Sequence, residues 1–167
     1  MDPLNRRVQR SKGINTHMKK NIPIDQAGLS REEIQLLELL RYFCSHFAAG
    51  LSPQEVLDKG MDPEILETEL SGRTVIAFMN VLLAMRQSRK SVFRFNSSHC
   101  AVCRHRVSEC ENLLLSTIRS RRNRELQAAR VYAMILCEGN DTDLLFIAID
   151  RMSAEMSLYP EAAWWEK

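Results

Sequence analysis

Three Ser-x-x-Glu sequences mark positions at which helices are expected to begin. They are Ser30 with Glu33, Ser52 with Glu55, and Ser108 with Glu111. In such a capping box the serine hydroxyl accepts from the glutamate N–H, and the glutamate carboxylate accepts from the serine N–H. Only six glycines and five prolines interrupt the 167 residues, of which 45% are hydrophobic. We therefore expect a small all-α domain.

The first expected helix, residues 33 to 47, is apolar over more than half of its circumference. Its apolar residues are Ile34, Leu36, Leu37, Leu39, Leu40, Tyr42, Phe43, Cys44 and Phe47. A helix that covers one core face needs only a stripe of apolar residues. The additional apolar surface predicts that a second element covers this helix, and the simplest candidate is the same helix of a second copy in a two-fold homodimer. We expect its interface to contain Ile34, Leu37, Leu40, Phe43 and Phe47.

The stretch from residue 60 to residue 96 combines helices with an aromatic segment. Asp62 and Pro63 can cap and open a short helix that Gly72 ends, and a longer helix is expected from Thr74 onward. Within it, apolar residues recur at helical spacing: Val75, Phe78, Met79, Leu82 and Met85. Phe93-Arg94-Phe95 then alternates as in a short strand, which would place both rings on one side.

This order of elements resembles the FlhD family, the smaller subunit of the flagellar master transcription activator. Gly60-Met61-Asp62 matches the family's glycine-hydrophobic-Asn/Asp turn, and Phe93 to Asn96 matches its FRF[DN] segment. The resemblance covers roughly residues 29 to 97. It implies a subunit that dimerises, binds a FlhC-like partner and acts with it at promoter DNA, where the complex recruits RNA polymerase. Relatives also occur on conjugative mobile elements, so the resemblance does not imply a flagellar role.

Charge is strongly segregated although the net charge is only +2. Residues 73 to 130 hold twelve basic and three acidic residues, whereas residues 25 to 72 hold three basic and ten acidic. The basic section could bind DNA phosphates, with Arg119, Arg121, Arg122 and Arg124 as contacts. It could equally face the acidic segment, within the chain or across a dimer. The sequence leaves both interpretations open.

A cysteine- and histidine-rich segment is the best candidate for a metal site. Cys100 and Cys103 have the spacing of a zinc knuckle, Cys110 follows, and His105 or His99 could complete four tetrahedral ligands. A structural zinc at Cys100, Cys103, His105 and Cys110 would fix the basic helix to the FRF segment. The alternatives are reduced cysteines without metal, or an iron–sulfur cluster that uses Cys44 or Cys137 as fourth ligand.

The chain divides into a flexible basic tail (1–24), a FlhD-like dimerisation region (25–98), and a cysteine-cluster and C-terminal helical region (99–167). It has no secretory signal and no apolar run that could span a membrane, so we expect a cytoplasmic protein. It also has no Gly-rich phosphate loop, nucleophile elbow or H-E-x-x-H motif, so we do not expect an enzyme or a small-molecule substrate. We expect a subunit of a heteromeric transcriptional activator. The alternative is a protein-binding adaptor or antiactivator that never contacts DNA.

Overall fold

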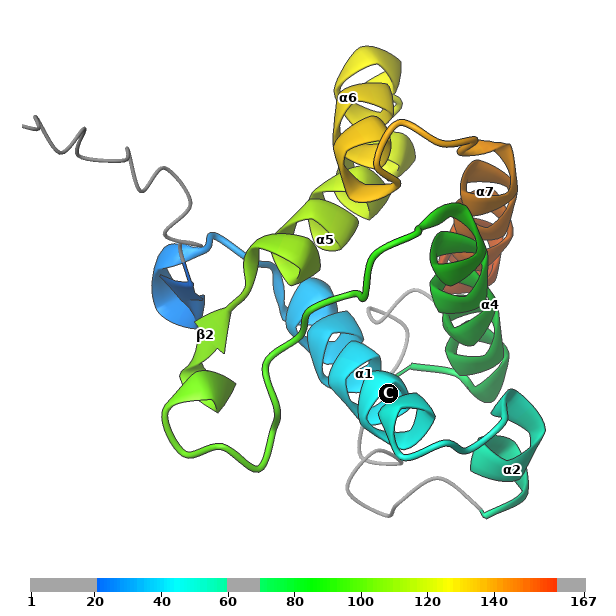
Figure 1. Cartoon of the computed structure of the whole chain (residues 1–167). Helices are drawn as coiled ribbons and strands as arrows, with labels where there is room; N and C mark the ends of the chain where they lie inside the picture. The colour runs from blue at the N-terminus through cyan, green and yellow to red at the C-terminus, as the bar shows by residue number, and fades with distance from the viewer. Residues whose placement is uncertain (1–20, 60–69, 159–167) are drawn as a thin grey trace, which may run out of the picture.

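The computed structural model describes residues 21–59 and 70–158 and confirms an all-α fold (Figure 1). The helices are α1 (Arg31–Ala48), α2 (Pro53–Asp58), α4 (Gly72–Ser88), α5 (Glu109–Arg122), α6 (Leu126–Leu136) and α7 (Asp143–Leu158). Two short 3-10 turns, η1 (Ile24–Gln26) and η2 (Cys103–His105), accompany a two-stranded antiparallel sheet of β1 (Ile22–Pro23) and β2 (Arg106–Val107). No helix in the described ranges is long and apolar enough to cross a membrane.

All three predicted capping boxes are present. Ser30, Ser52 and Ser108 each accept a hydrogen bond from the backbone of the glutamate three residues later, and each glutamate side chain accepts one in return. These boxes begin α1, α2 and α5, so local sequence determines where half of the named helices start.

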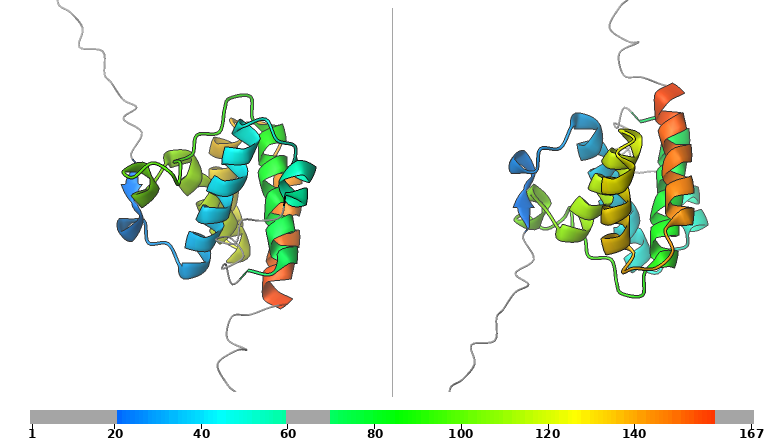
Figure 2. Two further views of the ribbon diagram at one scale, coloured as in Figure 1. Left: turned by 90° about the horizontal axis from the view of Figure 1, so that it is seen from below. Right: turned by 90° about the horizontal axis from the view of Figure 1, so that it is seen from above.

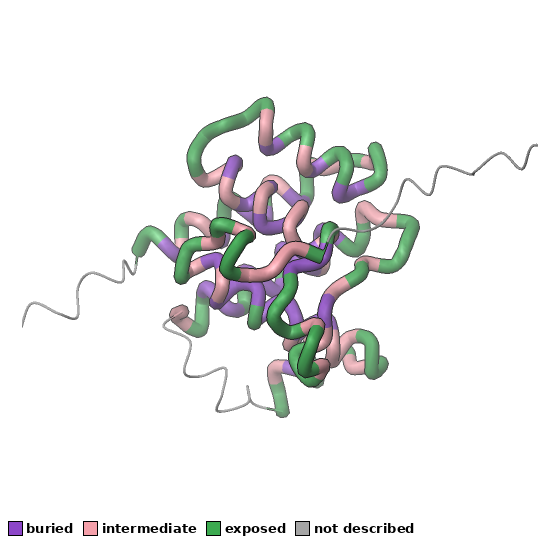
Figure 3. The backbone as a smooth tube through the Cα atoms, turned by 90° about the vertical axis from the view of Figure 1, so that its left-hand side faces the viewer, coloured by how far each residue is buried: buried purple, intermediate pink, exposed green. Residues whose placement is uncertain are grey.

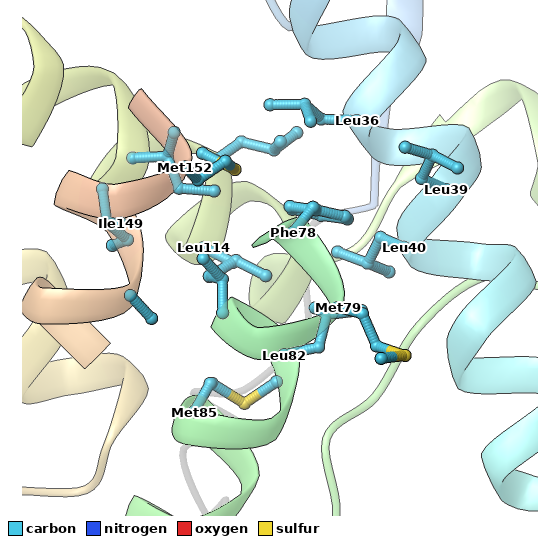
Figure 4. Packing of buried hydrophobic residues seen from close by; sticks show 14 of the residues in the cluster. Leu36, Leu39, Leu40, Phe78, Met79, Leu82, Met85, Leu114, Ile149 and Met152 are labelled. Carbon is cyan, nitrogen blue, oxygen red and sulfur yellow. The ribbon is translucent and has the colours of Figure 1, made fainter. Parts of the chain in front are cut away.

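A single hydrophobic core joins the first half of the chain to the second. Helices α4 and α7 lie side by side, and α1 packs on α4 and α5 (Figures 1 and 2). Figure 4 shows Leu40 of α1, Phe78 of α4 and Leu114 of α5 among the side chains around this interior. Buried positions gather in the middle of the molecule and exposed ones on its outer turns (Figure 3). The predicted regions 25–98 and 99–167 therefore share one core.

The wide apolar face of α1 is buried within the chain, which corrects the reason for expecting a dimer there. Leu37, Leu40 and Phe43 are at most 1% exposed, and Ile34 and Phe47 are partly buried. The second surface that covers this helix comes from other helices of the same chain, because α1 packs against α2, α4 and α5. These five residues no longer provide an argument for a homodimer.

The FRF segment is extended but forms no strand. Phe93 and Phe95 are half-buried and Arg94 between them is exposed, so the predicted alternation is present. No neighbouring strand pairs with this segment within the described residues, and side chains bind its backbone instead: Ser108 Oγ donates to the Arg94 carbonyl and Glu111 accepts from the Asn96 N–H. The strands that do pair are β1 and β2, neither of which includes the FRF segment.

Three boundaries differ from expectation. Gly72 begins α4 behind the Ser71 cap, whereas we expected it to end the preceding helix. Asn123, which by residue type could start the next helix, caps the end of α5, and α6 starts later, at Leu126. Residues 22 and 23, inside the expected flexible tail, form β1, which pairs with β2. The helix expected from residue 62 to residue 70 lies almost entirely outside the described residues.

The packing of α1 predicts the cost of truncating its central leucine. Leu40→Ala should lower the free energy of unfolding by about 2–5 kcal/mol, because it leaves a cavity in a fully buried site. Glu38→Ala, on the exposed side of the same helix, should change it by no more than about 0.5 kcal/mol. Chemical denaturation followed by circular dichroism measures both. Equal effects of the two substitutions would contradict the placement of α1.

Candidate functional site

A buried ion pair joins α1 to the first turn of α5. The Arg41 side chain is 4% exposed and the Glu111 side chain 0%. Arg41 Nε donates to Glu111 Oε1 at 2.8 Å, and Arg41 Nη2 donates to Glu111 Oε2 at 3.2 Å. The guanidinium thus binds the carboxylate through two hydrogen bonds, the geometry that best offsets the loss of hydration of two buried charges.

The remaining hydrogen-bonding capacity of this pair holds two loop segments. Arg41 donates to the carbonyls of Arg104, at 2.8 Å, and Arg106. Glu111 accepts from the backbone N–H groups of Asn96 (2.9 Å) and Ser108 (2.7 Å). Asn96 Nδ2 also donates to the Arg106 carbonyl at 2.8 Å. The Arg41–Glu111 network consists of Arg41, Asn96, Arg104, Arg106, Ser108 and Glu111. This network fixes both ends of residues 96–108, which we name the cysteine loop.

Two of the four predicted metal ligands come together in the cysteine loop. The Cys103 N–H donates to Cys100 Sγ at 3.2 Å. Hydrogen bonds from the thiol and backbone of Cys103, and from the Val102 backbone, lower the pKa of Cys100, whereas the thiol contact raises the pKa of Cys103. His105 Nε2 accepts from Arg104 Nε at 3.0 Å, and Cys110 lies in the first turn of α5.

In the part of the chain that the structure describes, no three His, Cys, Asp or Glu side chains gather as metal ligands would. All five cysteines are free thiols. Burial raises the pKa of Cys44 to about 12 and also raises the pKa of Cys137, which disfavours the thiolate that an iron–sulfur ligand requires. The Cys100–Cys103 pair can supply two ligands, and a zinc site that recruits His105 and Cys110 stays a prediction.

Three of the four arginines predicted to contact DNA form ion pairs within the chain. Arg119 binds Glu33 at 2.6 and 2.9 Å, and Arg122 binds Glu32 at 2.5 and 3.3 Å. Arg121 binds Asp150 of α7 at 2.8 and 2.7 Å. The fourth, Arg124, is exposed just beyond α5 with a φ of 61°. Arg119 and Arg122 thus face the acidic segment 25–72, one of the two interpretations that the sequence allowed.

The partly buried Arg119–Glu33 contact shifts both groups toward their charged forms. Burial raises the pKa of Glu33, but hydrogen bonds from Arg119 and Ser30 outweigh burial and hold this pKa below its usual value. The same hydrogen bond raises the pKa of Arg119. Together with the Ser30 cap, this contact ties the start of α1 to the last turn of α5.

Sequence reasoning missed two charged residues that hold loop backbone. Arg41 stands in an apolar helical run, and a lone arginine there is the one available sign of a buried partner. Glu138, just after α6, accepts from the Ser91 hydroxyl and from the N–H groups of Lys90 (2.9 Å) and Ser91 (3.1 Å). These hydrogen bonds lower the pKa of Glu138 to about 2. Nothing in the sequence pairs Glu138 with a segment so distant.

An apolar surface is left exposed on α6. Ala129, Ala133 and Leu136 are buried against the rest of the molecule. Other large apolar side chains of the helix are between 51% and 59% exposed: Leu126, Val131, Met134 and Ile135. We name these four residues the α6 surface. Apolar residues recur around much of this helix, so its sequence alone does not show which of them are buried.

No protein-family model, curated protein or solved structure matches this chain. The assignment of function therefore depends on the residues and contacts described above.

The Arg41–Glu111 network predicts a large and non-additive effect of substitution. Arg41→Met should lower the free energy of unfolding by about 3–5 kcal/mol, because it leaves the Glu111 carboxylate buried without a counter-ion. Adding Glu111→Gln should recover part of this loss. Arg121→Met, which removes the exposed ion pair with Asp150, should cost about 1 kcal/mol or less. Denaturant unfolding of the wild type, both single variants, the double variant and Arg121→Met tests this; strict additivity of Arg41→Met and Glu111→Gln would contradict the network.

The zinc prediction is tested by elemental analysis of protein purified without added chelator. We expect about one zinc ion per chain, its loss in Cys103→Ser, and a lower melting temperature in that variant. Cys44→Ala is the control and should keep the zinc. Metal-free wild-type protein that melts like Cys103→Ser would leave Cys100 and Cys103 as reduced thiols.

Proposed function

We propose that the chain is a regulatory subunit that acts by binding a protein partner through the α6 surface. The observation that carries this proposal is the exposure of α6 on the side opposite its buried alanines. Soluble monomers rarely leave large contiguous apolar areas uncovered, and such areas are typical of protein interfaces. In Figure 1, α6 lies at one end of the molecule, away from α1 and α2.

Further exposed apolar side chains lie on α7 and α4. Ile147 of α7 shares a mostly polar depression with Leu126 of α6, and it also lines a groove of about 750 Å³ between α7 and α4. In that groove Leu144 and Ile76 are about half exposed. Exposed apolar side chains of α4 and α7 thus lie next to one another in this groove, a suitable surface for an amphipathic helix of a partner.

Two forms of this function agree with the contacts of the chain. The ion pairs of Arg119, Arg121 and Arg122 support an adaptor, because these guanidinium groups are already bound to carboxylates. The resemblance to FlhD supports a subunit of a heteromeric activator that binds a FlhC-like partner at promoter DNA. Exposed arginines on the cysteine loop favour this second form.

The α6 surface is tested by comparing two double substitutions. Val131→Ser with Ile135→Ser should abolish partner binding, because both side chains are exposed on α6. The matched control, Val92→Ser with Val102→Ser, removes two equally apolar and more exposed side chains elsewhere and should leave binding unchanged. Affinity purification of each tagged protein from its native cells, followed by mass spectrometry, identifies partners that only the α6 variant loses.

Light scattering on the purified chain separates a second copy from a different partner. A wild-type dimer that becomes monomeric only in the α6 variant would show that another copy covers this surface. A wild-type monomer with partners lost in the α6 variant supports the heteromeric form. Identical partners and identical mass for wild type and the α6 variant would overturn the proposal.

A further inference from the structure

We propose that Arg94, Arg104 and Arg106 form a site that grips the phosphate backbone of duplex DNA, separate from the α6 surface and from the arginines of α5. We name these three residues the loop arginines. All three are exposed. DNA binding by the loop arginines requires no partner at the α6 surface, so DNA binding and partner binding can each be disproved independently.

The Arg41–Glu111 network brings the loop arginines together by their backbone. One guanidinium, that of Arg41, binds the carbonyls of both Arg104 and Arg106. Ser108 lies two residues after Arg106, and its Oγ donates to the carbonyl of Arg94 at 2.9 Å. Hydrogen bonds thus hold the carbonyls of all three residues, while their side chains are exposed to solvent.

The loop arginines have no carboxylate partner among the residues that the structure describes. Arg104 Nε donates to the ring of His105, and Arg106 Nη1 donates to the carbonyl of Asn21 at 3.2 Å. This differs from Arg119, Arg121 and Arg122, each of which binds a carboxylate through two nitrogens. The loop guanidinium groups therefore keep the charge and the donors that a phosphate needs.

Few carboxylates lie near the loop arginines in the described part of the chain. Antiparallel pairing of Ile22 with Val107 places Asn21 beside Arg106. The exposed carboxylates on the adjoining elements are Asp25 and Glu109. The three loop guanidinium groups outnumber them, even though the α5 arginines are neutralised.

Duplex DNA is the polyanion that this arrangement fits best. Guanidinium groups on a loop held at both ends are ordered before binding, so little conformational entropy is lost on contact with a regular row of phosphates. Each phosphate that is neutralised releases condensed counter-ions, which favours binding and makes it sensitive to salt. Contacts of this kind position a protein on DNA without reading its sequence.

The test measures binding of the full chain to a short fluorescent DNA duplex of arbitrary sequence, by anisotropy at increasing sodium chloride. Replacing the three loop arginines by alanine should weaken binding and lower the log–log salt slope by about 3, since each phosphate contact contributes about 0.9. The charge-matched control replaces Arg73, Arg130 and Arg151, which are exposed on α4, α6 and α7. This control should keep the wild-type slope.

Two further variants make the result decisive. Replacing the loop arginines by lysine keeps the charge and should preserve most of the salt slope, so this variant separates loss of charge from damage to the loop. Arg104→Ala alone should lower the salt slope by about 1. Thermal melting verifies that each variant is folded. Absence of DNA binding by the wild type at low salt, or equal losses in the loop and control variants, would overturn the proposal. So would binding to phosphatidylserine vesicles in place of DNA.

Discussion

The buried contact between Arg41 and Glu111 is the interaction on which the arrangement of the loops depends. It joins the central helix α1 to the capping box of α5, so one carboxylate serves both a helix start and an ion pair. Burying two charges away from water is costly, and the pair is tolerated because backbone groups of two loop segments satisfy its other donors and acceptors. Its structural role is to specify one arrangement of residues 94–108, which contain little apolar material of their own.

Local signals in the sequence were sufficient to predict the helices and much of the core. The three capping boxes set helix starts, and Val75, Phe78 and Leu82 are buried as their spacing predicts. The errors arose where the outcome depends on distant residues. Leu37 and Leu40 were assigned to a dimer because the periodicity of a helix shows how much surface must be buried, but not which element buries it. The same limit applies to Val131 and Ile135, whose exposure on α6 the periodicity does not indicate.

The candidate site was only partly predictable. The cysteine spacing identified the loop, and the charge count identified a basic section, yet neither indicates which arginines are neutralised. Arg122 and Arg104 belong to the same basic section, but one binds a carboxylate and the other does not. Such a distinction arises from tertiary contacts over more than 80 residues, such as Arg122 with Glu32, which no local pattern encodes.

Because the Arg41–Glu111 network holds the cysteine loop largely through main-chain groups, much of that hold does not depend on which side chains the loop carries. Arg104 and Arg106 contribute only their carbonyls to it. Any residue other than proline could occupy these two positions, and its carbonyl would accept the same hydrogen bond from Arg41. The loop is therefore a place where charge and shape can be exchanged with little effect on folding, so that recognition can evolve, or be engineered, separately from stability.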